Sequence, residues 1–381
     1  MADNCQLALL ELIKSSLFGF APVLPNDVDL DAVFEEAKAQ TVTALAAPAV
    51  PQDSALRWQE SASQSTAHYI RALFEQTNLI KLIEKNNIPL VILKGTAAAV
   101  YYPKPQLRTM GDIDFLVFEK DFERAYSLLE NSGFAFEGDY GDGRDYTFIK
   151  GEVVFELHRK YSDVGYDIED ILIDGMKRPV SRSVNGQSFP SLPDRENGLV
   201  LLDHIRHHLN NGLGLRQIID WTVFANRVLD NEYYQNQFLP ILTSAGLEKF
   251  CKIVTKMCKT HLYLPESLTW CDDADSATAD QLFENVMSDG NFGIKSDREF
   301  SPVSSFAARS KRDGFFKTLQ TAGVKNFDIC KKNKFFRSFA WLFQAFRYVK
   351  RGTASLFKGE KVIDNISAGN EKADFFNRLG L

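Results

Sequence analysis

The sequence has few cysteines and no pattern that would pair them. Its 381 residues include five, an odd number, with no CxxC. Cys258 and His261 are three residues apart, but no second Cys or His pair completes a zinc site. The sparse thiols therefore argue against a disulfide framework and indicate a reduced protein. The five are Cys5, Cys251, Cys258, Cys271 and Cys330.

Long apolar runs, and the pattern expected of a signal peptide in the first residues, are also missing. Asp3 precedes the first apolar stretch, and Glu11 and Lys14 interrupt it, which is unlike a signal peptide. No uncharged apolar run reaches the roughly 20 residues that a transmembrane helix needs. We expect a cytoplasmic protein without a transmembrane segment.

An overall excess of positive charge is absent as well. The formal net charge is -6, so the field of the whole chain does not attract nucleic acid, and such binding needs a local basic patch. The hydrophobic content of 45% and charged content of 25% are typical of folded proteins. At 381 residues the chain is long for one core, and two or three subdomains are expected.

The apolar periodicity changes twice along the chain and predicts three regions. Residues 1–86 have helical spacing, residues 87–180 contain short strands, and residues 190–381 are helical again. In the last region, helices are expected at Glu196–Leu209 and Leu215–Val228. The predicted fold class is α+β, with a small mixed-sheet core embedded between N-terminal and C-terminal helical regions.

The middle region is expected to follow the order β-α-β-α-β-β. The last two strands flank Lys150-Gly151, which is typical of a hairpin. The expected elements are strand Leu90–Leu93, helix Ala97–Tyr102, strand Ile113–Phe118, helix Asp121–Ser132, and strands Tyr146–Ile149 and Val153–His158.

The strand at Ile113–Phe118 has two carboxylates on its approach. Side chains alternate along a strand, so Asp112 and Asp114 share one face, whereas Ile113, Phe115 and Val117 face the core. Two adjacent carboxylates repel and raise each other's pKa unless a cation lies between them. Mg²⁺ favours carboxylate and phosphate oxygens. The pair therefore indicates a metal site, although a solvated strand end gives the same pattern.

The turn Lys94-Gly95-Thr96 lies between the first strand and the first helix of this region. A glycine there lets backbone N–H groups approach a phosphate, Lys94 adds a positive charge, and Thr96 can cap the helix. Arg108, four residues before Asp112, can meet triphosphate oxygens. The alternatives are an ordinary β-to-α turn and a surface ion pair.

A third acid occurs in the strand Val153–His158. Phe155 and Leu157 form its apolar face, while Glu156 and His158 point the other way. If this strand lies beside Asp114, Glu156 reaches the same metal as a third ligand, or acts as general base for an acceptor hydroxyl. The alternative is an exposed strand face.

These motifs together resemble the nucleotidyltransferase superfamily with the polymerase-β-like core, and within it the bacterial "uncharacterised nucleotidyltransferase" family. The resemblance spans about residues 60–230. It differs in having Gly95-Thr96 where Gly-Ser is usual and Glu156 where Asp is more frequent. It implies Mg²⁺ or Mn²⁺ and a nucleoside triphosphate (NTP). The residues that the resemblance assigns to the metal are Asp112, Asp114 and Glu156, and those assigned to the nucleotide are Lys94, Gly95, Thr96, Arg108 and Gly111.

A polar helix pair follows the core. His204 and His208 are one helical turn apart, and Arg216 and Asp220 lie on the next helix. We expect these four residues, with His158, on the acceptor side of the site. One alternative is a polar network between packed helices. The other is a zinc site at the two histidines, with His207 close by, although no Glu follows His204 as in HExxH and no Cys is near.

The segment 306–358 contains 13 Lys or Arg against two Asp, a net charge of +11, with interleaved Phe and Trp. This pattern suits RNA, an anionic membrane surface or another polyanion. It also suits amphipathic helices whose aromatic side chains pack inward.

The predicted function is transfer of a nucleoside monophosphate from an NTP to an acceptor hydroxyl on a small molecule, glycan or protein. Two alternatives stay open: a non-catalytic or regulatory nucleotide-binding protein, and a nucleic-acid-binding protein that uses the basic segment. The base and the acceptor do not follow from the sequence.

Overall fold

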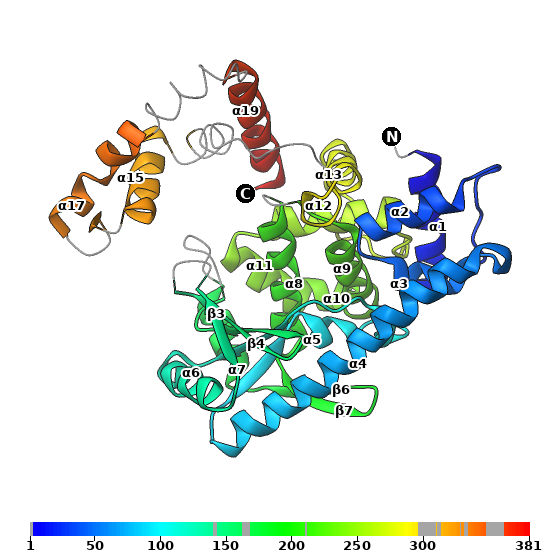
Figure 1. Ribbon diagram of the computed structural model, residues 1–381. Coiled ribbons are helices and arrows are strands. Elements are labelled where there is room, and N and C mark those ends of the chain that lie inside the picture. The colour runs from blue at the N-terminus through cyan, green and yellow to red at the C-terminus, as the bar shows by residue number, and fades with distance from the viewer. Residues whose placement is uncertain are drawn as a thin grey trace. The chain divides into compact units, whose positions relative to one another are not determined.

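The structure, a computed structural model, contains two compact units, Met1–Ser296 and Asp297–Leu381 (Figure 1). We describe each unit by itself. The described residues are 3–139, 143–161, 168–209, 212–295, 310, 314–327, 329–330, 334–347 and 362–381.

The first unit begins with helices whose ends are set by local polar residues. Helix α1 (Asn4–Phe18) starts with a capping box, in which Asp3 accepts from the Gln6 N–H and the Gln6 side chain accepts from the Asp3 N–H. Short helices α2 (Leu30–Ala39) and α3 (Thr43–Ala46) follow, and then the long helix α4 (Ala55–Lys85).

A seven-stranded mixed sheet forms the centre of this unit, in the order β3-β4-β5-β2-β1-β7-β6. The pairs β2–β5 and β1–β7 are parallel, and the other pairs are antiparallel. The strands are β1 (Leu90–Leu93), β2 (Ile113–Val117), β3 (Ala135–Gly138), β4 (Asp145–Lys150), β5 (Val153–His158), β6 (Val180–Val184) and β7 (Gln187–Ser191).

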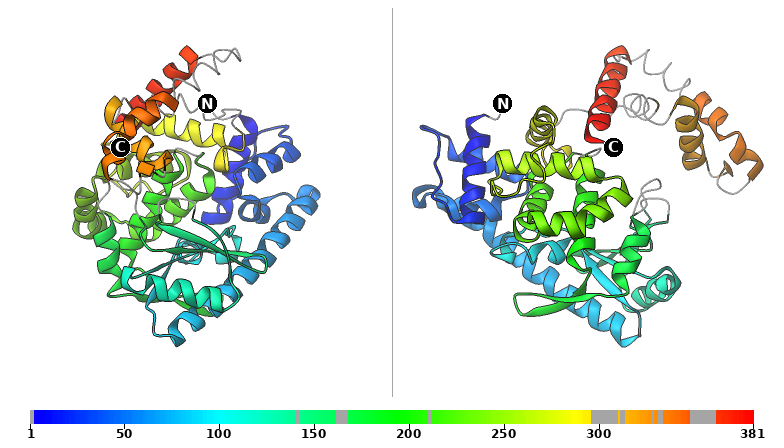
Figure 2. Two further views of the ribbon diagram at one scale, coloured as in Figure 1. Left: turned by 60° about the vertical axis from the view of Figure 1, so that its left-hand side comes forward. Right: turned by 180° about the vertical axis from the view of Figure 1, so that it is seen from behind.

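One face of the sheet is apolar because alternate residues of the central strands point toward it. Ile113, Phe115 and Val117 of β2 are buried in a core shared with α4 and with α6 (Phe122–Asn131). Figures 1 and 2 show α4 along this side of the sheet. The face that carries Asp114 points the other way.

Helices of the C-terminal half of the first unit lie on the opposite side of the sheet from α4 (Figures 1 and 2). Helix α8 packs on α9. The α-helices of the first unit not yet given bounds are α5 (Gly95–Ala99), which follows β1, and α7 (Glu169–Met176), α8 (Asp194–His208), α9 (Leu215–Val228), α10 (Asn231–Tyr233), α11 (Leu239–Ala245), α12 (Glu248–His261) and α13 (Ser276–Asp289).

The fold class is confirmed, and four of the strands lie where the sequence predicted them, as β1, β2, β4 and β5. The predicted order was wrong in omitting β3 and the β6–β7 hairpin, which falls in the polar stretch Arg178–Asp194. Strand β6 is mostly exposed at the sheet edge, so it has no apolar alternation to detect. Its turn, Asn185-Gly186, has both residues at positive φ, as tight hairpins require.

The second unit contains helices α15 (Phe315–Asn326), α17 (Lys334–Ser338) and α19 (Val362–Leu379), and a helical stretch at 340–347. Phe316, Phe335 and Phe346 are exposed, so these rings do not pack inward. Parts of the basic segment, including 306–309 and 348–358, lie outside the described residues. Among the helices that the structure describes, none is long and apolar enough to cross a membrane.

Candidate active site

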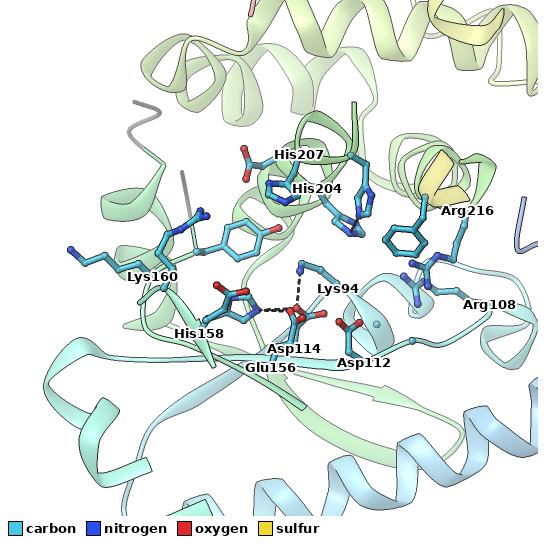
Figure 3. Close-up of a pocket in the computed structure, with 18 residues that line it drawn as sticks. Lys94, Arg108, Asp112, Asp114, Glu156, His158, Lys160, His204, His207 and Arg216 are labelled. Carbon is cyan, nitrogen blue, oxygen red and sulfur yellow. Dashed lines mark hydrogen bonds and ion pairs between the residues drawn. The ribbon is translucent and has the colours of Figure 1, made fainter. Parts of the chain in front are cut away.

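Strands far apart in sequence bring the predicted acids together. In the parallel β2–β5 ladder, Asp114 lies opposite Glu156, and on the other side of β2 it pairs with Leu93 of β1. Asp112 precedes β2 and lines the same cavity of about 260 Å³ (Figure 3). The side-chain alternation that predicted a shared face therefore places these three acids around one cavity.

Asp114 is the most buried of these acids, with 1% of its surface exposed. Its Oδ1 accepts from Lys94 Nζ at 2.7 Å and lies 2.9 Å from His158 Nε2. Burial alone would raise the pKa of Asp114, but the Lys94 ammonium and the His158 ring outweigh it and hold that pKa well below its ordinary value. Asp114 is therefore ionised.

Glu156 behaves in the opposite way. Burial, and then the charges of Asp114 and Asp112, raise the pKa of Glu156 to about 10. Lys94 offsets only part of this shift, so without a metal cation the carboxyl group is protonated near neutral pH. A cation next to Asp114 would remove the repulsion and favour the carboxylate form.

The donor set fits a hard divalent cation. Among the residues that the structure describes, Asp114, Glu156 and His158 are the one group of three or more His, Cys, Asp or Glu with a potential ligand atom from each within 4.8 Å of the others. Asp112 lines the same cavity with a further carboxylate. Carboxylate oxygens are the protein ligands that Mg²⁺ and Mn²⁺ favour.

The turn after β1 has an unusual backbone. Lys94 has φ 45° and ψ -131°, and Gly95 has φ 27°. A lysine in this region is strained, and such strain persists where the surroundings enforce it, here through the Lys94–Asp114 ion pair. Lys94 and Gly95 line the cavity. The buried Thr96 does not, and its hydroxyl donates to Gln76 Oε1 at 2.7 Å.

Arg108 lines the cavity, but its guanidinium is hydrogen-bonded to a buried carboxylate. Its Nε donates to Asp220 Oδ1 at 2.8 Å and its Nη2 to Asp220 Oδ2 at 2.7 Å. The Tyr102 hydroxyl donates to Oδ1 of the same carboxylate at 2.7 Å. Asp220 itself does not line the cavity, and its two carboxylate oxygens accept the hydrogen bonds from Arg108 and Tyr102.

Arg216 lies on α9 one turn before Asp220 and lines the cavity. Within the described part of the chain it forms no salt bridge, and its buried Nε has no hydrogen-bond partner. Burial, and then the neighbouring Arg108, lower the pKa of Arg216. Gly111 lies next to this guanidinium, because a Cβ at position 111 would be in ordinary van der Waals contact with Arg216 Nη1, at 3.5 Å.

Three histidines of α8 line the cavity opposite the acids (Figure 3). The Nε2 atoms of His204 and His208 are 3.0 Å apart, so one ring donates to the other. Burial, and then His208, hold the pKa of His204 well below its usual range. Burial, and then His207, lower the pKa of His208 to about 3. Both rings are therefore neutral.

Several lining residues were missed by the sequence analysis. Lys160 continues the two-residue alternation of Glu156 and His158, and that spacing was a usable signal. His207 lies in the same helical segment as the predicted His204 and His208, and the remaining residues depend on tertiary folding. They are Arg144, Asp145, Tyr161, Asp203 and Phe292.

The sequence pattern of the family described as "Uncharacterised nucleotidyltransferase" matches residues 28–263. The chain belongs to this family. Nucleotidyl transfer from an NTP is therefore its general chemistry. A search of curated proteins finds no match.

Two solved structures of nucleotidyltransferases resemble this chain. A crystal structure of ANT(2″)-Ia in complex with adenylyl-2″-tobramycin is 11% identical, with a TM-score of 0.33, and the alignment covers 45% of this chain and 97% of that one. An antigenic nucleotidyltransferase-like protein from Paracoccidioides brasiliensis is 14% identical, with a TM-score of 0.32 and coverage of 52% and 94%.

Proposed function

We propose that this protein transfers a nucleoside monophosphate from an NTP to an acceptor hydroxyl and releases pyrophosphate. The observation that carries the proposal is the convergence of Asp112, Asp114 and Glu156 on one cavity in a member of a nucleotidyltransferase family. Asp112, Asp114 and Glu156 would hold Mg²⁺ or Mn²⁺. The bound ion supplies Lewis-acid stabilisation of phosphoryl charge.

The cationic side chains near the acids would bind different phosphates of the NTP. Arg216 has a guanidinium without a salt bridge among the described residues, so it is the residue best suited to the β- and γ-phosphates. Lys94 and the Gly95 turn lie beside Asp114, where the α-phosphate would be transferred. Arg108 acts indirectly, because its hydrogen bonds to Asp220 leave Arg216 unpaired.

The arrangement also supports one direction of attack. Figure 3 shows Arg216 and Lys160 on opposite sides of the acids. Attacking and leaving oxygens lie roughly in line during phosphoryl transfer. With pyrophosphate leaving on the Arg216 side, the acceptor hydroxyl enters from the Lys160 side. As a metal ligand Glu156 would be a carboxylate, because a cation beside Asp114 offsets the repulsion that raises the pKa of Glu156.

The test is label transfer by the purified full chain. The chain is incubated with each NTP labelled at the α-phosphate, with Mg²⁺ or Mn²⁺ and a cell extract as acceptor source. Label is expected in an acceptor with the wild-type chain and is expected to be lost in Asp112→Asn/Asp114→Asn. The control is Asp170→Asn/Asp174→Asn, which changes two exposed acids of α7.

Two results would contradict the proposal. Label transfer that survives Asp112→Asn/Asp114→Asn would exclude the metal assignment. NTP binding by calorimetry without transfer to any acceptor would instead favour a regulatory nucleotide-binding protein.

A second role concerns the basic segment 306–358, with its net charge of +11 and exposed Phe335 and Phe346. These features favour an additional contact with an anionic surface. Flotation of the chain with vesicles of phosphatidylserine and phosphatidylcholine tests it. Binding that is unchanged by Phe335→Ser/Phe346→Ser, or by high salt, would exclude this role.

A further inference from the structure

The segment Gly290–Gly293 places one aromatic ring at the active-site cavity. Phe292 lines the cavity, although 61% of its surface is exposed. It lies outside the residues 28–263 that match the family pattern. Phe292 therefore reaches the cavity from outside the matched part of the chain.

The backbone of Phe292 is left-handed, with φ 56° and ψ 26°. This conformation is strained for a bulky residue and persists where neighbours enforce it. The Phe292 N–H donates to Gly212 O at 3.1 Å. The two backbones approach so closely that a Cβ at position 212 would lie 1.9 Å from Gly293 N. Only glycine at position 212 allows this contact.

The residue before Phe292 anchors the segment on its buried side. Asn291 is 6% exposed, and its Oδ1 accepts from Gln217 Nε2 of α9 at 3.0 Å. Its Nδ2 donates to Thr41 Oγ1 at 2.9 Å. A buried polar anchor thus holds a strained residue whose own ring stays largely uncovered. Packing of the Phe292 ring into the core does not account for this arrangement.

Among the described residues, an aromatic ring contacts Phe292 from α8. Phe292 and His208 meet edge to face, with centroids 5.1 Å apart. His208 in turn contacts His204 through their Nε2 atoms at 3.0 Å. The exposed ring therefore lies next to imidazoles that can donate or accept a hydrogen bond. These imidazoles do not cover the ring with aliphatic groups.

We propose that Phe292 is a stacking platform for the nucleobase of the NTP, with His204 and His208 facing the edge of the base. The inference rests on the proposed function, which supplies a planar base attached to the phosphates. Aromatic rings stack on every base, and the imidazoles beside the platform supply the groups that can distinguish one base edge from another. Phe292 is thus a residue that determines nucleotide affinity and base preference.

Calorimetry with the full chain and Mg²⁺ tests this platform. The probes are ATP, GTP, CTP, UTP and inorganic tripolyphosphate, which has the phosphates without a base. Phe292→Ala is expected to weaken binding of the preferred NTP by about 5-fold to about 150-fold. The affinity of Phe292→Ala for tripolyphosphate is expected to stay within about 2-fold of the wild-type value. A change of that size is far smaller than the change expected when the stacking of one base is lost. Phe292→Trp is expected to restore NTP binding.

The matched control is Phe74→Ala on α4, because Phe74 is also 61% exposed and does not line the cavity. Unchanged NTP affinity in Phe292→Ala, or an equal loss for tripolyphosphate and NTP, would overturn the platform. If the wild type binds tripolyphosphate and every NTP equally well, the platform is wrong while the phosphate site stands. If it binds none of these probes, the proposed function itself fails.

Discussion

The Arg108 guanidinium and the Asp220 carboxylate form two parallel hydrogen bonds, of 2.8 and 2.7 Å, between residues that are 112 positions apart. Both side chains are almost completely buried. Because Arg108 and Tyr102 occupy the Asp220 oxygens, Arg216 on the preceding turn of α9 is left to face the cavity. A structural ion pair thereby determines which of two arginines is available to a substrate.

Breaking this pair is expected to destabilise the first unit. Asp220→Ala leaves the Arg108 guanidinium buried without its carboxylate, and such losses cost about 3–5 kcal/mol. Urea unfolding followed by circular dichroism measures the change. Asp280→Ala, which removes an exposed partner of His261, is the control and is expected to cost less than about 1 kcal/mol. An equal, small effect of both changes would show that the buried pair contributes little.

Arg216→Met is expected to lower the affinity for phosphates without lowering the free energy of unfolding. The methionine keeps an unbranched apolar stem and removes a partly buried cation that has no salt bridge within the described residues, so the free energy of unfolding should stay constant or rise. Affinity for inorganic tripolyphosphate should fall by about 10-fold or more, as expected for the loss of one charged hydrogen bond of about 1.5–3 kcal/mol. Calorimetry and urea unfolding measure the two quantities, with Arg227→Met at the exposed end of α9 as control. Unchanged tripolyphosphate affinity would assign the phosphates to another residue.

Glu156 is expected to make stability depend on pH when divalent cations are removed by EDTA. Its folded pKa of about 10 lies above the unfolded value of about 4.3, so its carboxyl group stabilises the fold most below pH 4.3. That contribution is lost progressively as the pH rises from about 4.3 toward 10. Glu156→Gln cannot ionise, and at pH 8 it should be more stable than wild type by more than about 1.4 kcal/mol.

Thermal unfolding between pH 5 and pH 9 checks this prediction, and Glu137→Gln on the exposed strand β3 is the control. Adding MgCl₂ at pH 8 should raise the unfolding temperature of the wild type more than that of Glu156→Gln. Parallel pH profiles for wild type and Glu156→Gln would disprove the assigned titration.

Gly212→Ala is expected to move the Phe292 segment. The new Cβ would lie 1.9 Å from Gly293 N, so the segment must shift, and NTP affinity should fall as it does in Phe292→Ala. Gly133→Ala has a similar positive φ, of 81°, but its Cβ would meet nothing within 4 Å. It reports the backbone cost alone, about 1 kcal/mol or more. If both variants bind NTP as the wild type does, the contact at Gly212 does not position the ring.

The central strands could be predicted because their signal is local. The alternation around Asp112–Asp114 and around Glu156–His158 sets which face each side chain takes, and hydrophobic burial enforces it. The pairing of Arg108 with Asp220 carries no such signal, since two segments of the chain must fold before the residues meet. The sequence placed both residues near the site but did not indicate that they bind each other.

Phe292 shows a second limit of sequence reasoning. Its position depends on the close approach of Gly212 and on the contacts of Asn291 with Gln217 and Thr41. None of these residues is unusual in its own segment of the sequence. The β6 edge strand was missed for a different reason: residues on both of its faces are exposed, so the alternation of a half-buried strand is lost.

The parallel register that sets Asp114 opposite Glu156 has a practical consequence for measuring this protein. A shift of one residue would set an apolar neighbour of Glu156, Phe155 or Leu157, opposite Asp114 and turn Glu156 to the other face of the sheet. In each molecule Glu156 therefore lies either on the same face as Asp114 or on the opposite face, and a register between these two does not exist. Counting competent sites by cation or nucleotide titration would therefore give the fraction of a preparation that has folded correctly.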